Sequence, residues 1–81
     1  MYIVYILRSL KRPERIYIGF TTVEIKLRVK RHNDGSTPAT ARYRPWELVT
    51  YTAFANKDKA LAYERYLKSG SGRAFLHKRL I

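Results

Sequence analysis

The sequence predicts an α+β fold, a small three-stranded antiparallel sheet flanked by helices in the order β-β-α-β-α-α. Three short runs rich in β-branched and aromatic residues indicate the strands. Segments with apolar residues at helical spacing follow the second and third runs and indicate helices. The connection between the first two runs is too short for the crossover that a parallel pair requires, which favours an antiparallel hairpin.

The first half of the chain contains the hairpin and one helix. Its first run is continuously apolar, which is typical of a strand buried on both faces. Thr21 or Thr22 can cap the helix, with Glu24 near its positive N-terminal end, and Gly35 ends it. The expected elements are a strand at 2–7, a loop at 9–14, a strand at 15–20 and a helix at 23–33.

The second half contains the third strand and two more helices. Two prolines and several small or polar residues predict an exposed loop before the strand. Asn56 is a good N-cap for the next helix, which a Ser-Gly-Ser-Gly run breaks. The expected elements are a loop at 36–45, a strand at 46–54, a helix at 56–68, a break at 69–72 and a short helix at 73–80 with Phe75, Leu76 and Leu80 inward.

Length and composition restrict the class of protein. Eighty-one residues correspond to one small domain, so we expect residues 1–81 to form a single domain. No apolar run approaches the ~18–20 residues of a membrane span, so we expect a soluble, unprocessed chain with no membrane partner. The absence of cysteine excludes a disulfide scaffold and a thiolate zinc site and is compatible with a reducing compartment. We therefore expect a cytoplasmic protein.

The net charge points to a polyanionic partner. Seventeen Lys and Arg against six Asp and Glu give a net charge of +11 and a pI near 10.4. Such a basic domain is typical of nucleic-acid binding, and a charged protein without a partner is the alternative. The candidate contacts are Lys30 and Arg31 on the first helix and Arg42, Tyr43 and Arg44 in the exposed loop. Tyr43 either stacks on unpaired bases or closes the core, and both alternatives stay open.

Two strand tyrosines form the first candidate for a chemical site. Side chains alternate along strands, and we expect Tyr5 and Tyr17 to sit opposite each other, a register that pairs Leu7 with Arg15. Their phenol groups then lie next to Gly19, where a missing side chain lets a ligand approach the backbone. A packing role for each tyrosine is the alternative.

Two helices contribute further candidates. Arg28 and His32 lie four residues apart on one helix face, bordering its apolar stripe, and are placed to face a cleft or to form part of a solvated basic edge. Glu64 lies on or beside the inward face of a later helix, where a carboxylate is costly unless it is paired or binds a cation. A salt bridge and a magnesium ligand are the two alternatives for Glu64.

These residues together suit phosphodiester hydrolysis. The reaction needs a base for water, a cation for the developing charge and a metal for the leaving oxygen. A tyrosine with a pKa of ~10 is a poor base at neutral pH, but a nearby guanidinium and a bound metal both favour its phenolate form. No Ser-His-Asp set or P-loop is present, and two histidines without cysteine argue against structural zinc.

The motifs resemble the GIY-YIG nuclease superfamily, and in their later part its small stand-alone bacterial (UPF0213-like) members. The similarity covers nearly the whole chain in the right order, although Ile3-Val4-Tyr5 stands where the first motif has its glycine. The matching stretches are Tyr2-Ile3-Val4-Tyr5-Ile6-Leu7, Tyr17-Ile18-Gly19-Phe20-Thr21-Thr22, Arg28-x-x-x-His32-Asn33-x-Gly35, Arg44-Pro45-Trp46-Glu47-Leu48-Val49 and Ala60-x-x-x-Glu64-x-x-Leu67-Lys68.

The resemblance implies a role for each candidate. Tyr5 and Tyr17 match the tyrosines of the first and second motifs, and Gly19 matches the second motif's glycine. Arg28 matches the catalytic arginine, His32 an assisting residue, and Glu64 the metal-binding glutamate. It also implies a metal-dependent endonuclease that hydrolyses phosphodiester bonds in DNA with Mg²⁺ or Mn²⁺.

We therefore expect the following mechanism and partners. Tyr5 or Tyr17, with Tyr5 favoured, deprotonates water directly or through His32, Arg28 steadies the charge at phosphorus, and the metal on Glu64 stabilises the leaving oxygen. DNA, including branched or damaged DNA, is the expected partner, and RNA is the alternative. We expect a monomer or weak homodimer that can work with a protein partner. The rival functions are a non-catalytic nucleic-acid-binding module and the nuclease subunit of a repair or recombination complex.

Overall fold

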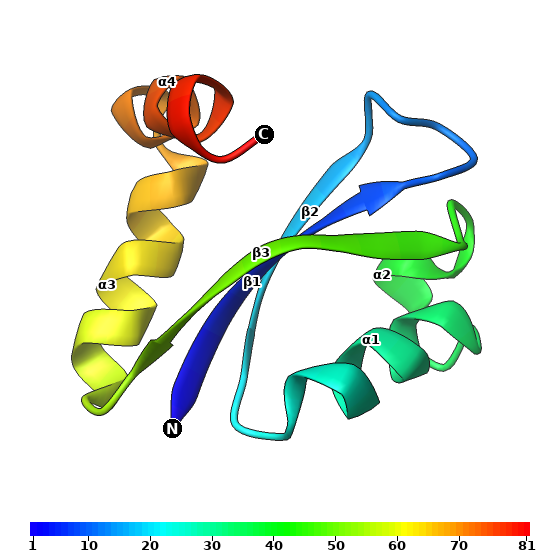
Figure 1. The fold of residues 1–81 in the computed structure, drawn as a ribbon, viewed down its shortest axis with the longest axis horizontal. Helices are drawn as coiled ribbons and strands as arrows, with labels where there is room; N and C mark the ends of the chain where they lie inside the picture. Colours follow the sequence, from blue (N-terminus) through cyan, green and yellow to red (C-terminus); the bar gives the residue numbers. More distant parts are fainter.

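A computed structural model describes residues 1–81 and contains one three-stranded sheet and four helices (Figure 1). This arrangement confirms the predicted α+β class. The elements in chain order are β1 (Tyr2–Ser9), β2 (Ile16–Thr21), α1 (Ile25–Asn33), α2 (Pro38–Ala41), β3 (Trp46–Phe54), α3 (Lys57–Lys68) and α4 (Gly70–Arg79). None of the helices combines the length and the hydrophobicity needed to cross a bilayer.

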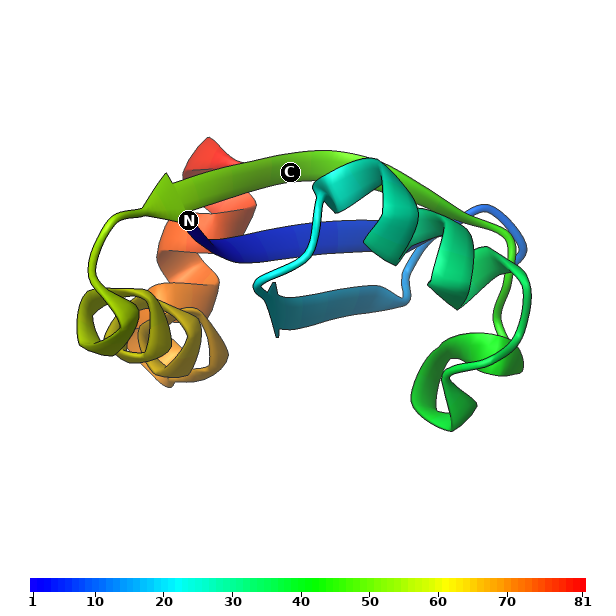
Figure 2. The same cartoon turned by 90° about the horizontal axis from the view of Figure 1, so that it is seen from below.

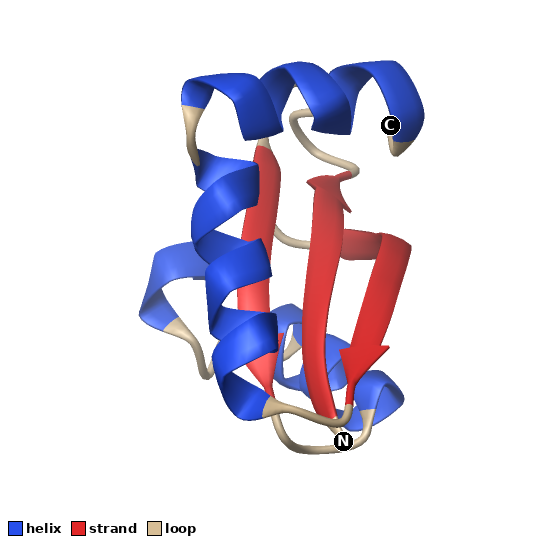
Figure 3. Ribbon diagram, turned by 90° about the vertical axis from the view of Figure 1, so that its left-hand side faces the viewer, coloured by secondary structure: helices blue, strands red, loops and turns tan.

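The sheet places β1 in the centre, antiparallel to β2 on one side and to β3 on the other. Helices cover both of its faces, with the α3–α4 pair and the α1–α2 pair on opposite sides of the strands (Figure 2). Figure 3 shows α3 and α4 in front of the strands. A central strand covered on both sides needs apolar residues at consecutive positions, which explains the continuous apolar run of β1.

Each face of the sheet has its own hydrophobic core. Val4 and Ile6 of β1 point toward α3 and α4, where they pack with buried residues of both helices. Tyr5 and Leu7 point to the other face and pack with Trp46 at the start of β3. One face of β1 therefore contributes to the larger core, and the other face presents Tyr5 to α1.

The observed hairpin register differs from the predicted one by two residues. Tyr5 pairs with Gly19, and Leu7 pairs with Tyr17. The expected pairing of Tyr5 with Tyr17 is therefore wrong, although both side chains still lie on the same face of the sheet. A Cβ atom added at Gly19 would overlap the phenol ring of Tyr5. The glycine therefore makes room for the Tyr5 side chain, whereas we expected it to make room for a ligand.

The first helix begins two residues later than predicted, and its cap is different. Glu24 is the N-cap of α1, and its carboxylate accepts hydrogen bonds from the backbone N–H groups of Lys26 (3.1 Å) and Leu27 (3.3 Å). The expected cap Thr21 instead belongs to β2. A charged carboxylate that accepts two N–H groups stabilises the helix start more than one hydroxyl does. Gly35, with φ of +84°, follows the helix end as predicted.

The segment 36–45 is not simply an exposed loop. Residues Pro38–Ala41 form the short helix α2, with proline at its first position and Thr40 completely buried. Proline suits this position because its fixed φ angle matches a helix and its missing N–H is not needed there. The four-residue helix is too short for a periodic pattern to reveal it.

The last helix starts three residues earlier than predicted. Ser69 is its N-cap and accepts a hydrogen bond from the N–H of Gly72 (3.2 Å), so the break after α3 is one residue long. Leu76 is buried as expected and Leu80 packs against the core, but Phe75 is exposed and lies against Tyr66, with ring centroids 6.0 Å apart. The prediction that Phe75 points inward is therefore wrong.

Candidate active site

The buried phenol of Tyr5 is the centre of the site. Its hydroxyl lies 2.7 Å from Nε2 of His32 and accepts a hydrogen bond from Nε of Arg28 at 3.1 Å. Tyr5 and His32 are both 0% exposed, whereas Arg28 is half-buried. The four-residue spacing on α1 thus brings the imidazole and the guanidinium to the same phenol, on the face of the sheet that α1 covers.

The second nitrogen of His32 defines its protonation. Nδ1 lies 2.6 Å from the hydroxyl of Thr40, which itself donates to the carbonyl of Thr37 at 3.3 Å. With the hydroxyl proton of Thr40 donated to Thr37, Nδ1–H of His32 donates to Thr40, and Nε2 accepts the proton of Tyr5. Burial, together with the charge of Arg28, lowers the pKa of His32 to about 4, so the ring is neutral at neutral pH.

A second layer of hydrogen bonds holds this arrangement in place. The indole N–H of Trp46 donates to the carbonyl of Thr40 at 2.8 Å. The side chain of Asn33 accepts from the backbone N–H of Trp46 at 2.6 Å and donates to its carbonyl at 3.0 Å. These contacts tie α2 and the start of β3 to α1. Analysis of the sequence did not assign these positioning residues a role, although Asn33 and Trp46 lie within the quoted motif stretches.

The environment of Tyr5 favours its protonated form. Burial raises the pKa of its phenol above the usual value of 10, and the charges of Tyr17 and Glu64 act in the same direction. The hydrogen bond and the charge of Arg28 lower that pKa, as expected, but burial has the larger effect. The resting phenol therefore keeps its proton, which points at the free Nε2 of His32.

Tyr17 is held less tightly than Tyr5. Its ring is half-buried and its centroid lies 5.0 Å from that of His32 and 6.3 Å from that of Tyr5. Its hydroxyl makes no hydrogen bond within the protein, and the side chain lines a groove on the outer side of β2. Tyr17 thus belongs to the same cluster but is free to contact a ligand.

Glu64 lies on α3, in the other layer of helices. Its negative charge is the smallest of the influences that raise the pKa of Tyr5. Its side chain is only 19% exposed and pairs with Lys68 across 3.3 Å. Of the two alternatives for Glu64, the salt bridge is therefore present in the structure.

The donor set at Glu64 suits one class of metal. No three His, Cys, Asp or Glu side chains cluster in a way that would hold a metal ion by protein ligands alone. Mg²⁺ usually keeps several waters and takes one or two carboxylates together with substrate phosphates. A single, largely buried carboxylate in a basic domain fits that pattern and does not fit zinc.

The expected nucleic-acid contacts occupy two different surroundings. Lys30 and Arg31 are exposed on α1. Tyr43 is half-buried, packs against the core that contains Trp46, and lies between the guanidinium groups of Arg42 (5.4 Å to the ring centroid) and Arg15 (4.7 Å). The contact of Tyr43 with the core agrees with one of its two alternatives, and stacking on unpaired bases stays a prediction.

Arg44 is already engaged within the protein. Its guanidinium covers Gly35 so closely that a Cβ atom there would overlap it. This contact explains why a residue with a left-handed φ and no side chain follows α1.

Comparison with known proteins places the chain in a family. Residues 1–78 match the family described as the GIY-YIG catalytic domain, and the chain therefore belongs to the GIY-YIG family. The resemblance found in its motifs is thus confirmed. The resemblance to the small UPF0213-like members is confirmed as well. The chain is 36% identical to "UPF0213 protein in ldhD 5'region" of Pediococcus acidilactici over 61 residues, which cover 72% of the chain and 61% of that protein.

Longer relatives contain a similar stretch. The chain is 38% identical over 69 residues to "Structure-specific endonuclease subunit slx1" of Talaromyces marneffei, which covers 78% of the chain and 18% of that protein. It is 35% identical over 74 residues to "Structure-specific endonuclease subunit SLX1" of Debaryomyces hansenii, covering 83% of the chain and 21% of that protein. The chain thus spans about a fifth of the length of these relatives.

Proposed function

We propose that this chain is an endonuclease that hydrolyses phosphodiester bonds in DNA and depends on Mg²⁺ or Mn²⁺. The observation that carries the proposal is the hydrogen-bonded chain from Arg28 through Tyr5 to His32. It combines a positive charge, a phenol and a free acceptor nitrogen in a domain with a net charge of +11. Family membership supports the same conclusion.

In the proposed mechanism, Tyr5 relays a proton from water to His32. The phenol gives its proton to Nε2 of His32 while its oxygen takes one from the attacking water, and the resulting hydroxide displaces the leaving oxygen at phosphorus. The low pKa of His32 makes it a weak acceptor in the free protein, in part because of Arg28. A bound phosphodiester offsets the charge of Arg28, which raises the pKa of His32 when substrate is present.

Arg28 and Glu64 have separate tasks. The guanidinium of Arg28 stabilises the negative charge that develops on the phosphoryl oxygens. Glu64 would hold the divalent ion, whose positive charge then supports the departing oxygen. Lys68 pairs with Oε2 of Glu64, so a divalent ion held by this carboxylate would compete with the lysine for it.

The names of the longer relatives suggest a substrate and a protein partner, which we include in the proposal. The slx1 proteins are named structure-specific endonuclease subunits, which supports a branched DNA as substrate and a protein partner for this chain. RNA is the alternative substrate class, and the oligomeric state is a monomer or weak homodimer. The rival function, a basic module that binds nucleic acid without cutting it, is supported by the charge alone.

Cleavage assays with matched variants test the proposal. Arg28→Ala and Glu64→Gln should each lower the rate of cutting branched or duplex DNA in Mg²⁺ or Mn²⁺ by roughly 10²-fold or more. Lys26→Ala, an exposed change on the same helix as Arg28, should leave the rate unchanged. Metal-independent cutting, or full activity of both site variants, would contradict the proposal. Binding of DNA by the wild-type chain without any cutting would support the rival module.

A further inference from the structure

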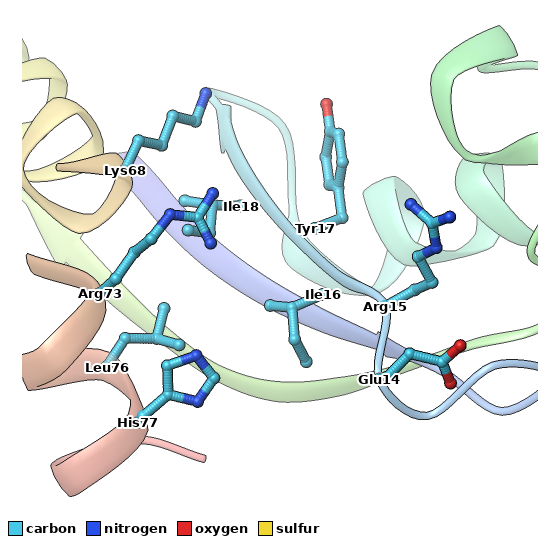
Figure 4. Close-up of a pocket in the computed structure, with 9 residues that line it drawn as sticks. All are labelled: Glu14, Arg15, Ile16, Tyr17, Ile18, Lys68, Arg73, Leu76 and His77. Atoms are coloured by element: carbon cyan, nitrogen blue, oxygen red, sulfur yellow. The ribbon is translucent and has the colours of Figure 1, made fainter. Parts of the chain in front are cut away.

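A groove of about 470 Å³ lies beside the catalytic cluster, between β2 and the corner where α3 meets α4 (Figure 4). We call it the β2–α4 groove. Its floor contains Ile16 and the buried Leu76, its rim contains Lys68 and Arg73, and Tyr17 stands on the side toward α1. None of the family motifs accounts for Ile16, Arg73 or Leu76.

The groove combines an apolar floor with a cationic rim. Ile16 is partly exposed and presents aliphatic surface above the buried Leu76, and Tyr17 adds an aromatic ring whose hydroxyl makes no hydrogen bond within the protein. Lys68 and Arg73 extend over this floor from the α3–α4 corner (Figure 4). A ligand that fits both features has a flat, weakly polar body joined to a negative charge. The volume of the groove falls within the roughly 300–1,000 Å³ range of small-molecule sites.

Positive charge dominates the lining of the groove. Arg73 forms no ion pair in the structure, Lys68 is paired with Glu64, and the guanidinium of Arg15, which also lines the groove, lies over the ring of Tyr43. The single acid in the lining, Glu14, is bound loosely to Arg12 at 3.9 Å. The groove therefore has an excess of positive charge, which attracts phosphate groups.

Two residues connect the groove to the catalytic cluster. The ring of Tyr17 lines the groove and also lies 5.0 Å, between centroids, from His32. Lys68 lines the groove and pairs with the carboxylate of Glu64. A polynucleotide with one phosphate at Arg28 and Glu64 would thus carry its neighbouring nucleotide past Tyr17 into the groove.

We propose that the β2–α4 groove binds an unpaired nucleotide of the substrate strand, next to the phosphodiester that is cut. The base lies on Ile16 beside Tyr17, and its phosphate lies between Lys68 and Arg73. Stacking on an aromatic ring needs an exposed base face, which an unpaired nucleotide offers and a base inside a duplex does not. The statement that this nucleotide lies next to the cut rests on the proposed nuclease function.

Chemical-shift mapping locates the binding site without requiring catalysis. The ¹⁵N-labelled chain is titrated with a tetrathymidylate oligonucleotide in the presence of a chelator, so that no strand is cut. The largest amide shifts should occur in residues 16–18 and 73–77. A blunt, self-complementary DNA duplex without unpaired nucleotides, added in place of the oligonucleotide up to the same phosphate concentration, should shift these amides less. Largest shifts on the exposed surface of β3, or none in the groove, would overturn the inference.

A matched pair of charge reversals separates the groove from general attraction. Arg73→Glu should weaken binding of the oligonucleotide about tenfold, because the side chain loses its contact to phosphate and repels it. Arg79→Glu changes the net charge equally on the same helix but lies outside the groove, and should weaken binding less than threefold. Equal weakening by both variants would overturn the inference.

The same experiments distinguish this inference from the proposed function. DNA cutting by the wild-type chain with no response of the groove amides would reject the groove and leave the nuclease function. Binding in the groove with no cutting of any DNA in Mg²⁺ or Mn²⁺ would reject the nuclease function and leave a nucleotide-binding groove.

Discussion

His32 shows how burial decides the chemistry of a single residue. The motif spacing indicated that His32 shares a helix face with Arg28, but it did not indicate that the imidazole would lose all contact with solvent. Complete burial beside Arg28 keeps the ring neutral and leaves Nε2 free to accept a proton from Tyr5. The residue that sequence analysis treated as an assistant is the proton acceptor in the proposed mechanism.

The lowered pKa of His32 predicts a pH dependence of stability. The folded protein holds this pKa at about 4, against 6.5 for the free side chain, so the unfolded chain binds the proton more readily. Neutral His32 therefore contributes to the free energy of unfolding, on the order of 3 kcal/mol. This contribution is complete above pH 6.5 and disappears as the pH falls toward 4.

Urea unfolding of the wild type at pH 4.5 and pH 7 measures this effect. The loss of unfolding free energy between the two pH values should be smaller in His32→Gln, whose amide does not titrate. His77→Gln, a change at the exposed histidine, should keep the loss seen in the wild type. Equal losses in all three proteins would show that His32 is not held neutral by the fold.

Gly19 predicts a second effect at this scale. A methyl group at Gly19 overlaps the ring of Tyr5 and approaches that of Tyr17, so Gly19→Ala should displace the phenol from His32. We expect a loss of about 1–3 kcal/mol in unfolding free energy and a strong loss of cutting. Gly70→Ala, where nothing lies within 4 Å of the added carbon, should be neutral in both assays. A fully active Gly19→Ala protein would contradict the steric role of this glycine.

At the scale of elements, apolar patterning predicted more than capping did. Strand β3 was predicted at its observed bounds, and α3 follows Asn56 and ends at Lys68 as expected. The errors lie where a short-range competition decides the outcome. Glu24 replaced the threonines as the cap of α1, and Ser69 started α4 inside a glycine-rich run that suggested a break.

The hairpin register was the error that mattered most for the site. Alternation along the strands correctly put both tyrosines on one face, but it fits two registers that differ by two residues equally well. The choice depends on the space that the ring of Tyr5 needs above Gly19, which only the three-dimensional packing reveals. The burial of Thr40 in α2 is likewise a result of packing against α1.

The cap of α1 yields a prediction at this scale. Glu24→Ala removes the acceptor of two backbone hydrogen bonds and should lower the unfolding free energy by about 1 kcal/mol. Thr22→Ala removes the exposed residue that the sequence suggested as a cap and should change it by less than about 0.5 kcal/mol. The midpoints of urea denaturation measured at pH 7 compare the two. A larger loss of unfolding free energy in Thr22→Ala than in Glu24→Ala would show that Thr22, and not Glu24, caps α1.

At the scale of the whole molecule, the candidate site joins the two layers of helices around the hairpin. Tyr5 comes from the central strand, Arg28 and His32 come from α1 on one face, and Glu64 comes from α3 in the other layer. The sequence motifs pointed to these residues in their order along the chain, and hydrogen bonds join three of them, Tyr5, Arg28 and His32. The hydrogen bonds that hold the site, through Thr40, Asn33 and Trp46, join segments far apart in the chain and depend on the complete fold.

The central claim is that the phenol of Tyr5 takes part in phosphodiester hydrolysis. Single-turnover cutting of a branched DNA in saturating Mg²⁺, with circular dichroism as a check on folding, measures it most directly. Tyr5→Phe should reduce the rate by roughly 10²–10⁴-fold, because the proton path from water to His32 is lost. Tyr51→Phe, the same change at an exposed tyrosine of β3, should cut at the wild-type rate. A folded Tyr5→Phe protein that cuts as fast as the wild type would contradict the claim.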